Sequence, residues 1–218
     1  MKLMIVDDHQ VVRQGIANLL RSMLPAVAIT EVENGQDAVA RYGELRPDVV
    51  LLDMGLPDIS GLEVGRRLRQ RWRGAAILFF TMHDELPMVR QALDIGGLGF
   101  VSKSCAPEEL AEAVKRVAAG QPYIEHPIAT RLAMNQERPV DHRLRDMTQR
   151  EMEVLLMYAR GESVGGIAER LCVSSKTVSN HLAGLKSKLQ VSSSVELIHL
   201  AVDAGLIRYG QLEEARRV

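Results

Sequence analysis

The chain has 218 residues, of which 46% are apolar and 25% charged, and its formal net charge is −1. This composition excludes collagen-like, disulfide-dense and strongly disordered classes, and the near-zero charge excludes a uniformly basic protein. Any affinity for nucleic acid must therefore come from a local patch. Because only 4% of the residues are aromatic, we also expect no surface of stacked rings for single strands.

The sequence gives no sign of membrane or secretory targeting. No apolar run approaches the roughly 20 residues that span a bilayer, and the start of the chain is too acidic for a signal peptide. Cys105 and Cys172 lie far apart, without a CxxC motif. We expect a cytoplasmic protein with reduced thiols and no membrane partner.

In residues 1–120, short apolar runs alternate with amphipathic segments. Strands are predicted at 3–6, 26–32, 49–52, 76–80 and 98–101, and helices at 10–23, 36–45, 61–72, 85–93 and 107–119. The runs are nearly uninterrupted by polar residues, as strands buried on both faces should be. Five βα units in this order predict an α/β domain with a doubly wound parallel sheet.

A proline-containing segment at 121–146 is predicted to be a linker with a short helix at 127–134. The remainder, 147–208, shows no strand pattern and is predicted to be an all-α domain. Its helices are expected at 148–159, 163–171, 175–189 and 194–204. Thr148 and Glu151 form a capping box at the start of the first of these helices.

Polar residues stand at the carboxyl ends of several predicted strands. Asp7 and Asp8 follow the first strand, Asp53 the third, Thr81 the fourth and Lys103 the fifth. Ligands of parallel α/β sheets gather at this edge, and clustered carboxylates suit Mg²⁺. An Asp beside Mg²⁺ is suited to attack phosphorus, while a lysine and a hydroxyl balance the phosphoryl charge. The alternative is that each Asp merely caps the helix that follows.

Four short motifs lie at these strand ends: Val6-Asp7-Asp8-His9, Asp53-Met54-Gly55-Leu56-Pro57 with Gly61, Thr81-Met82, and Gly99-Phe100-Val101-Ser102-Lys103. As an ordered set they resemble the receiver domain of bacterial response regulators. Over nearly its whole length, the chain resembles the NarL/FixJ/LuxR family, in which a receiver precedes a helix-turn-helix domain. The resemblance implies a CheY-like five-stranded receiver.

The resemblance also implies the roles of the acidic residues. Asp53 would accept the phosphoryl group, and Asp8 would bind Mg²⁺ directly. Asp7 would assist, often through water, and the Gly55 carbonyl would complete the protein ligands.

Three further residues would respond to phosphorylation. By the same resemblance, Thr81 and Lys103 would hold the phosphoryl oxygens, and Phe100 would swing inward when Thr81 closes on the phosphate. From the residues alone, a phenylalanine in a strand is simply part of the core. The phosphoryl donor would be a partner histidine kinase or a small acyl phosphate.

The helix predicted from Ser175 combines a buried stripe with local positive charge. The stripe consists of Val178, Leu182, Leu185 and Leu189, and residues 174–190 hold three lysines and no acid. The preceding segment, with Val173 and Ser174 as the turn, fits a helix-turn-helix. Periodicity alone leaves an ordinary small helical bundle open.

The pattern Met147-Thr148-Gln149-Arg150-Glu151, Gly161, Ile167-Ala168, Thr177-Val178, His181 and Lys188-Leu189 resembles the LuxR type in order and spacing. It implies that the helix from Ser175 enters the major groove of double-stranded promoter DNA. Ser179, Asn180 and Ala183 would face the bases, with Asn180 suited to adenine. The other contacts would come from Ser174, Ser175, Lys176, Thr177, His181, Lys186 and Lys188, largely to phosphates.

The chain departs from its relatives in this helix. Many carry basic residues where Ser179 and Ala183 stand here, and Gly184 lies inside the helix. Fewer cations predict weaker non-specific binding and a shallower salt dependence, so that DNA binding relies on a homodimer. In this family the last helix, here 195–202, forms a dimer interface. The residues at 123–124, 171–172 and 195–202 also resemble, more weakly, those of the GacA/UvrY branch.

We therefore predict a two-component transcription regulator in which phosphorylation of Asp53 controls dimerisation and promoter binding, as signalling chemistry and not enzymatic turnover. One alternative is a phosphohydrolase, which Gly55 disfavours because it stands where an acid/base Asp would be needed. The other is a phosphorylation-controlled interaction protein with weak or no sequence-specific DNA binding.

Overall fold

The computed structural model describes residues 1–82, 84–134, 142–144, 147–204 and 206–207. Contacts divide the chain into two compact units, Met1–Met134 and Asn135–Val218. Each unit has its own core and is described by itself.

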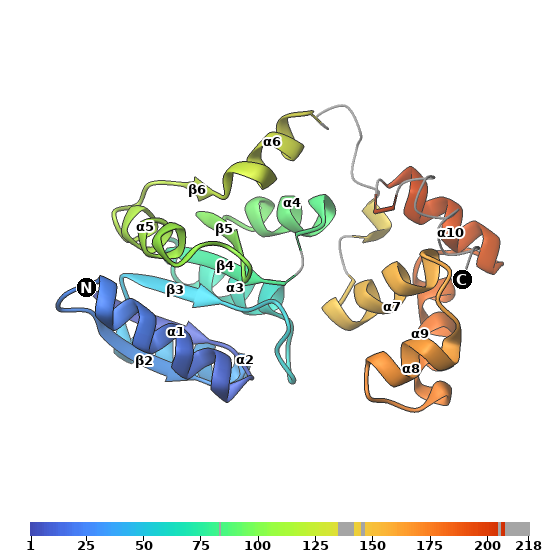
Figure 1. Ribbon diagram of the computed structural model, residues 1–218, viewed down its shortest axis with the longest axis horizontal. Helices are drawn as coiled ribbons and strands as arrows, with labels where there is room; N and C mark the ends of the chain where they lie inside the picture. Colours follow the sequence, from blue (N-terminus) through green and yellow to red (C-terminus); the bar gives the residue numbers. More distant parts are fainter. Residues whose placement is uncertain (83, 135–141, 145–146, 205, 208–218) are drawn as a thin grey trace. The chain divides into compact units, whose positions relative to one another are not determined.

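The first unit is a parallel sheet with helices on both faces (Figure 1). Its strands run in the order β2-β1-β3-β4-β5-β6, and every pairing is parallel. The strands are β1 (Lys2–Val6), β2 (Ala28–Val32), β3 (Val49–Leu52), β4 (Ile77–Thr81), β5 (Gly99–Ser102) and β6 (Tyr123–Ile124). The helices are α1 (Gln10–Met23), α2 (Gly35–Leu45), α3 (Gly61–Arg71), α4 (Leu86–Asp94), α5 (Pro107–Ala118) and α6 (His126–Met134).

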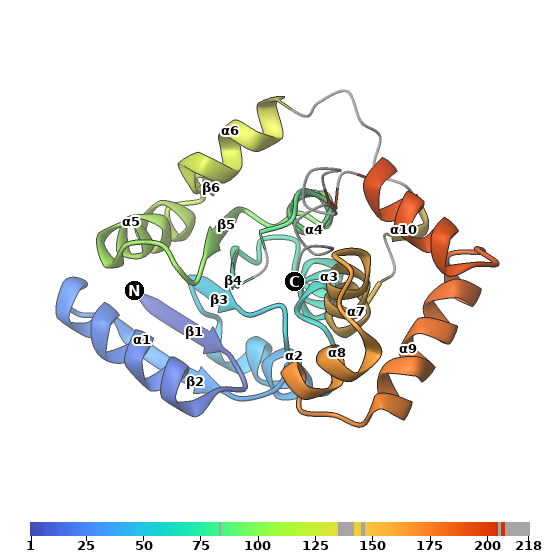
Figure 2. The ribbon, with the colours of Figure 1, turned by 45° about the vertical axis from the view of Figure 1, so that its right-hand side comes forward.

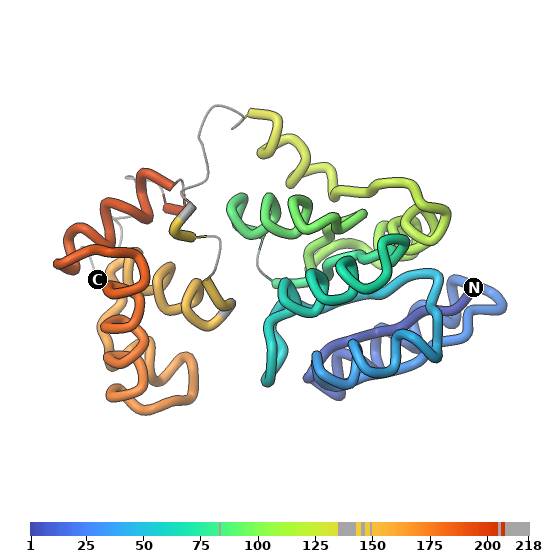
Figure 3. The backbone as a smooth tube through the Cα atoms, turned by 180° about the vertical axis from the view of Figure 1, so that it is seen from behind, coloured from blue at the N-terminus to red at the C-terminus, as the bar shows by residue number. Residues whose placement is uncertain are grey.

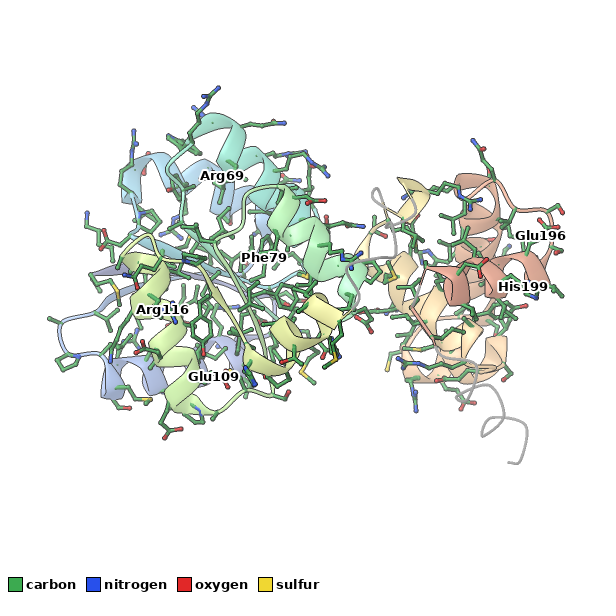
Figure 4. The ribbon with its side chains drawn as sticks, turned by 90° about the horizontal axis from the view of Figure 1, so that it is seen from above. Arg69, Phe79, Glu109, Arg116, Glu196 and His199 are labelled. Carbon is green, nitrogen blue, oxygen red and sulfur yellow. The ribbon has the colours of Figure 1, made fainter. Side chains whose placement is uncertain are left out.

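Helices α1 and α5 cover one face of the sheet, and α2 and α3 come forward when the molecule is seen from behind (Figure 3). Leu51 and Leu78 point toward α1 and α5 in one cluster of buried side chains. Phe79 lies on the other side, within the interior of the unit (Figure 4). The predicted doubly wound sheet is confirmed, and the ends of all five predicted strands and helices agree within two residues.

The described residues contain a sixth strand, which corrects the five-stranded prediction. Strand β6 pairs with β5 through Gly99↔Tyr123 and Phe100↔Ile124. The Glu125 carboxylate accepts a hydrogen bond of 2.7 Å from the backbone N–H of Ser102. Because a strand of two residues has no measurable periodicity, the sequence pattern placed this segment in the linker.

The short helix predicted at 127–134 is confirmed as α6, and it packs against α4. Ile128 is 1% exposed, and the Arg131 guanidinium lies 2.9 Å from the Asp84 carboxylate. These two elements, β6 and α6, begin the predicted linker and belong to the first compact unit. Residues 135–141 of that linker lie outside the described residues.

The second unit is helical throughout its described part, as predicted (Figure 2). It contains a short 3₁₀ helix (His142–Leu144), α7 (Gln149–Ala159), α8 (Val164–Arg170), α9 (Ser175–Lys188) and α10 (Ser194–Asp203). Serine or threonine caps the start of all four α-helices by accepting a backbone N–H. The predicted stripe of α9 is buried, and the predicted domain end at 208 lies outside the described residues.

Candidate functional site

The carboxyl ends of β1, β3 and β5 bring two carboxylates and one ammonium together. The Lys103 Nζ atom lies 2.7 Å from Asp7 Oδ2 and 2.8 Å from Asp53 Oδ2. Each residue directly follows its strand, and neighbouring parallel strands end at the same edge. This fold therefore brings Lys103 into contact with residues that lie 96 and 50 positions earlier in the chain.

Burial and the neighbouring charges shift the pKa values of Asp53 and Lys103 in opposite directions. Asp53 is 6% exposed and Asp7 is 2% exposed. Burial raises the pKa of Asp53, and the nearby ammonium of Lys103 only partly offsets this rise. For Lys103, burial lowers the pKa, but the carboxylates of Asp53 and Asp7 outweigh it and leave the pKa raised. Lys103 is thus held as a cation beside the Asp53 carboxylate.

Asp7, Asp8 and His9 form the second part of the acidic site, and one ligand atom from each lies within 4.8 Å of the others. The His9 backbone N–H donates to Asp7 Oδ1 at 2.8 Å, and His9 Nδ1 lies 2.7 Å from Asp8 Oδ1. Asp7 Oδ2 and Asp8 Oδ1 are enclosed, and they lie 2.7 Å from Lys103 Nζ and His9 Nδ1 respectively. Enclosed carboxylate oxygens of this kind fit a hard cation such as Mg²⁺.

A close backbone contact fixes the loop that carries Asp53. A Cβ atom on Gly61 would lie 2.1 Å from the Asp53 carbonyl oxygen and 2.8 Å from Met54 Cα. The Gly61 N–H donates to the Met54 carbonyl at 3.0 Å, and the Met54 N–H donates to Asp53 Oδ1 at 2.8 Å. The N-terminus of α3 therefore rests directly on the backbone of Asp53. The sequence motif contains this glycine but not the reason for it.

The three residues expected to respond to phosphorylation are all close to the end of the sheet. Thr81 is fully buried at the end of β4, and its carbonyl accepts the Lys103 N–H at 2.8 Å. Phe100 is fully buried in β5, with its ring centroid 6.5 Å from that of Phe79. In this structure Phe100 is a core residue, and its predicted inward swing stays a prediction. Gly55 is half-buried, and its backbone N–H slightly opposes the rise in the pKa of Asp53.

Sequence reasoning missed one residue that positions the acidic site. The Arg13 guanidinium donates to the Asp7 carbonyl at 2.7 Å and lies 3.6 Å from the Glu31 carboxylate. This contact links α1 and β2 to the end of β1. An arginine on an amphipathic helix carries no sequence signal for such a role, because charged side chains are usual on that face.

In the second unit, the predicted base-facing residues lie on the open face of α9. Ser179, Asn180 and Ala183 are exposed, as are Ser175 and Lys176 in the first turn. The Ser174 hydroxyl accepts the Thr177 N–H at 3.1 Å and therefore caps the helix. His181 is half-buried.

The two C-terminal lysines of α9 are engaged inside the unit. Lys186 Nζ donates to the Ser194 hydroxyl at 3.0 Å, and Lys188 Nζ lies 2.7 Å from the Glu151 carboxylate. Glu151 also completes the capping box of α7 by accepting the Thr148 N–H at 2.8 Å. Lys186 and Lys188 thus have partners inside the unit in this structure, and their expected contacts with DNA stay a prediction.

The turn between α8 and α9 is held from α7. Cys172 has a positive φ of 52° there, and the Arg150 guanidinium donates to the Leu171 carbonyl at 2.9 Å. A rigid turn fixes the direction of the helix that follows it. Separately, no helix of the described residues is long and apolar enough to cross a membrane.

Comparisons with known proteins match each of the two parts of the chain to a known family. Residues 3–115 match the response regulator receiver domain, and residues 145–201 match the luxR family of bacterial regulatory proteins. The chain is 50% identical to the transcriptional activator protein ExaE of Pseudomonas putida over 212 residues, covering 95% of this chain and 99% of ExaE. It is 36% identical to the response regulator UvrY of Escherichia coli K12, covering 93% and 94%.

Among solved structures, the RcsB response regulator of Salmonella typhimurium matches with a TM-score of 0.58. The match covers 91% of this chain and 96% of RcsB, at 24% identity. At this identity the likeness supports the fold alone.

Proposed function

Because the chain belongs to the LuxR-type response regulators of two-component systems, on the UvrY/GacA branch, we propose that Asp53 accepts the phosphoryl group. Members of this family are DNA-binding transcription regulators. The observation that carries the assignment is the contact of Lys103 with Asp53 at 2.8 Å, beside the acidic pair Asp7 and Asp8.

In the proposed reaction, a carboxylate oxygen of Asp53 attacks the phosphorus of a phosphohistidine on the partner kinase, or of a small acyl phosphate. A P–O bond to Asp53 forms, while the donor's P–N or P–O bond breaks and its electron pair leaves with the donor. The ammonium of Lys103 and the hydroxyl of Thr81 would hold the phosphoryl oxygens. Lys103 needs little movement for this, because it already contacts the attacking carboxylate.

Asp7, Asp8 and Asp53, with the Gly55 carbonyl, would hold Mg²⁺. The clustering of the Asp7 and Asp8 carboxylates at the end of β1, beside the carboxylate of Asp53, supports this set. The cation would supply positive charge that offsets the repulsion between the incoming phosphoryl oxygens and the carboxylates. His9 contacts one of the Asp8 carboxylate oxygens and would have to release it to the cation.

The output of the site would be promoter binding by a homodimer in the cytoplasm. The receiver exists in two conformations, and phosphorylation favours the one that interacts better with the phosphoryl group. The shift in population is set by the difference in that interaction free energy between the two conformations. The helix α9 would lie in the major groove, with its N-terminal hydroxyls and N–H groups on phosphates. Dimerisation through the receiver or α10 would double the contacts.

The direct test is phosphorylation by a small acyl phosphate with Mg²⁺, followed by intact-protein mass spectrometry. The wild-type chain should gain one phosphoryl group, and Asp53→Asn should gain none. Asp48→Asn is the matched control, because Asp48 precedes the same strand at its opposite end, where it accepts the Lys2 N–H. Equal labelling of Asp53→Asn and wild type would contradict the assignment.

A further inference from the structure

The exposed face of α9 is almost free of large side chains. Its exposed residues are Ser175, Lys176, Ser179, Asn180, Ala183, Gly184 and Ser187. A Cβ atom on Gly184 would meet nothing within 4 Å, so this part of the helix faces open space. Only one of these residues, Lys176, is charged, and only Asn180 carries an amide.

The remaining lysines of α9 have partners within the unit. Lys186 is held by Ser194 at the start of α10, and Lys188 is held by Glu151 of α7. The side chain of Lys188 is only 30% exposed. Residues 179–184, in the middle of the helix, include no lysine or arginine, although α9 contains three lysines.

This chemistry bears on which bases the helix reads. Guanine is usually recognised by arginine or lysine at its O6 and N7 atoms, adenine by asparagine or glutamine at N6 and N7, and thymine by apolar contact with its methyl group. Asn180 has the adenine-reading amide, and Ala183 offers a methyl group three residues further on the same face. Small neighbours allow the helix to approach the base edges closely.

We propose that α9 reads A·T base pairs, with Asn180 on an adenine and the Ala183 methyl group on a neighbouring thymine methyl. This inference rests on the proposed function of α9 as the helix that enters the major groove. Lys176, in the first turn, is assigned to a phosphate, where helix N-termini and cations position a protein without reading sequence. The half-site then has no guanine contact from the middle of the helix.

Selection of bound duplexes from a random pool tests the adenine contact. The full-length chain is used with beryllofluoride and Mg²⁺, and the selected half-site should contain an invariant adenine. Asn180→Ala should weaken the selected site by about 5- to 150-fold and lose this preference. Asn180→Arg should move the preference at that position to guanine, and Ser187→Ala, on the same face, should change neither.

Replacing thymine with uracil in the selected duplex tests the methyl contact without altering the protein. Wild type should lose about fourfold in affinity at one thymine, the value of one buried methyl group. Ala183→Gly should show no such loss at that thymine, with its helix content checked by circular dichroism. Lys176→Ala should weaken all duplexes alike and reduce the salt slope by about one.

Guanine at the Asn180-dependent position, or equal sensitivity to uracil in wild type and Ala183→Gly, would overturn the inference. Binding without any base preference would also overturn it but would leave the proposed function in place. Absence of binding to every duplex, even at low salt, would overturn both.

Discussion

At the scale of single residues, the acidic site depends on one cation between two carboxylates. Lys103 contacts both Asp7 and Asp53, which are almost fully buried. Buried carboxylates this close repel each other unless a cation lies between them. Lys103 therefore keeps the site assembled before a phosphoryl group arrives, and it is then already in place to bind one.

The contact between Gly61 and the backbone of Asp53 gives a prediction at the same scale. Gly61→Ala should cost about 1–3 kcal/mol of unfolding free energy and slow phosphorylation, because the new Cβ overlaps the Asp53 carbonyl. Chemical denaturation and acyl-phosphate labelling measure the two effects. Gly15→Ala in α1 is the control, since its Cβ meets nothing within 4 Å and helix propensity favours alanine. Unchanged stability and labelling in Gly61→Ala would contradict this account.

The sequence predicts site residues that the sheet topology places together, but not contacts that depend on how two helices pack. Asp7, Asp53 and Lys103 were predictable as neighbours, because the carboxyl ends of parallel strands meet at one edge. The engagement of Lys188 was not, because its partner Glu151 lies 37 residues away on another helix. No periodicity encodes how α7 packs against α9, so this ion pair could not be expected from the sequence.

At the scale of elements, Glu151 joins the start of α7 to the end of α9. Burial raises the pKa of Glu151, but the hydrogen bonds from Lys188 and Thr148 outweigh it and hold the pKa below its usual value. A carboxyl group with a lowered pKa in the folded state stabilises the fold above its unfolded pKa of about 4.3. That contribution is lost as the pH falls through the folded pKa.

Glu151→Gln keeps the hydrogen-bonding shape of the cap and removes the charge. It should lower the unfolding free energy by about 0.5–1 kcal/mol near pH 7, with no difference from wild type once the pH is below the folded pKa. Denaturation followed by circular dichroism over a pH series measures this. Glu196→Gln, at the exposed start of α10, should have a smaller effect. A difference that persists undiminished at low pH would contradict the ion-pair assignment.

The packing of α6 predicts that the start of the linker stabilises the receiver. Ile128→Ala should cost about 2–4 kcal/mol, because the side chain is almost fully buried against the first unit. Met134→Ala is the control, since Met134 is 80% exposed on the same helix and should change stability little. Thermal unfolding of the full chain measures both. Equal behaviour of the two variants would indicate that α6 does not pack as described.

The sequence predicts the long strands and helices but not the shortest strand. The five longer strands and the helices follow from uninterrupted apolar runs and amphipathic periodicity, and their ends agree closely with the structure. Strand β6 was missed because its pairing depends on β5, not on its own two residues. Strand β6 pairs with β5, which carries Phe100, and α6 follows β6 in the chain and leads to the second unit.

At the scale of the whole molecule, the chain contains both the acidic site around Asp53 and the helix α9, which has few cationic side chains. Residues 1–120 carry a net charge of −2 and residues 141–218 a net charge of +1. We therefore expect non-specific attraction to DNA to be weak and to depend on how many phosphates a complex contacts. Regulation through dimerisation suits such a protein, because doubling the contacts has its largest effect when each copy binds weakly.

Fluorescence anisotropy tests whether phosphorylation of Asp53 controls DNA binding. The affinity of the full chain for a selected duplex is measured with and without beryllofluoride and Mg²⁺, over a salt series. We predict tighter binding with the phosphoryl mimic in wild type and no change in Asp53→Ala. Equal affinity in both states of the wild-type chain would contradict phosphorylation control.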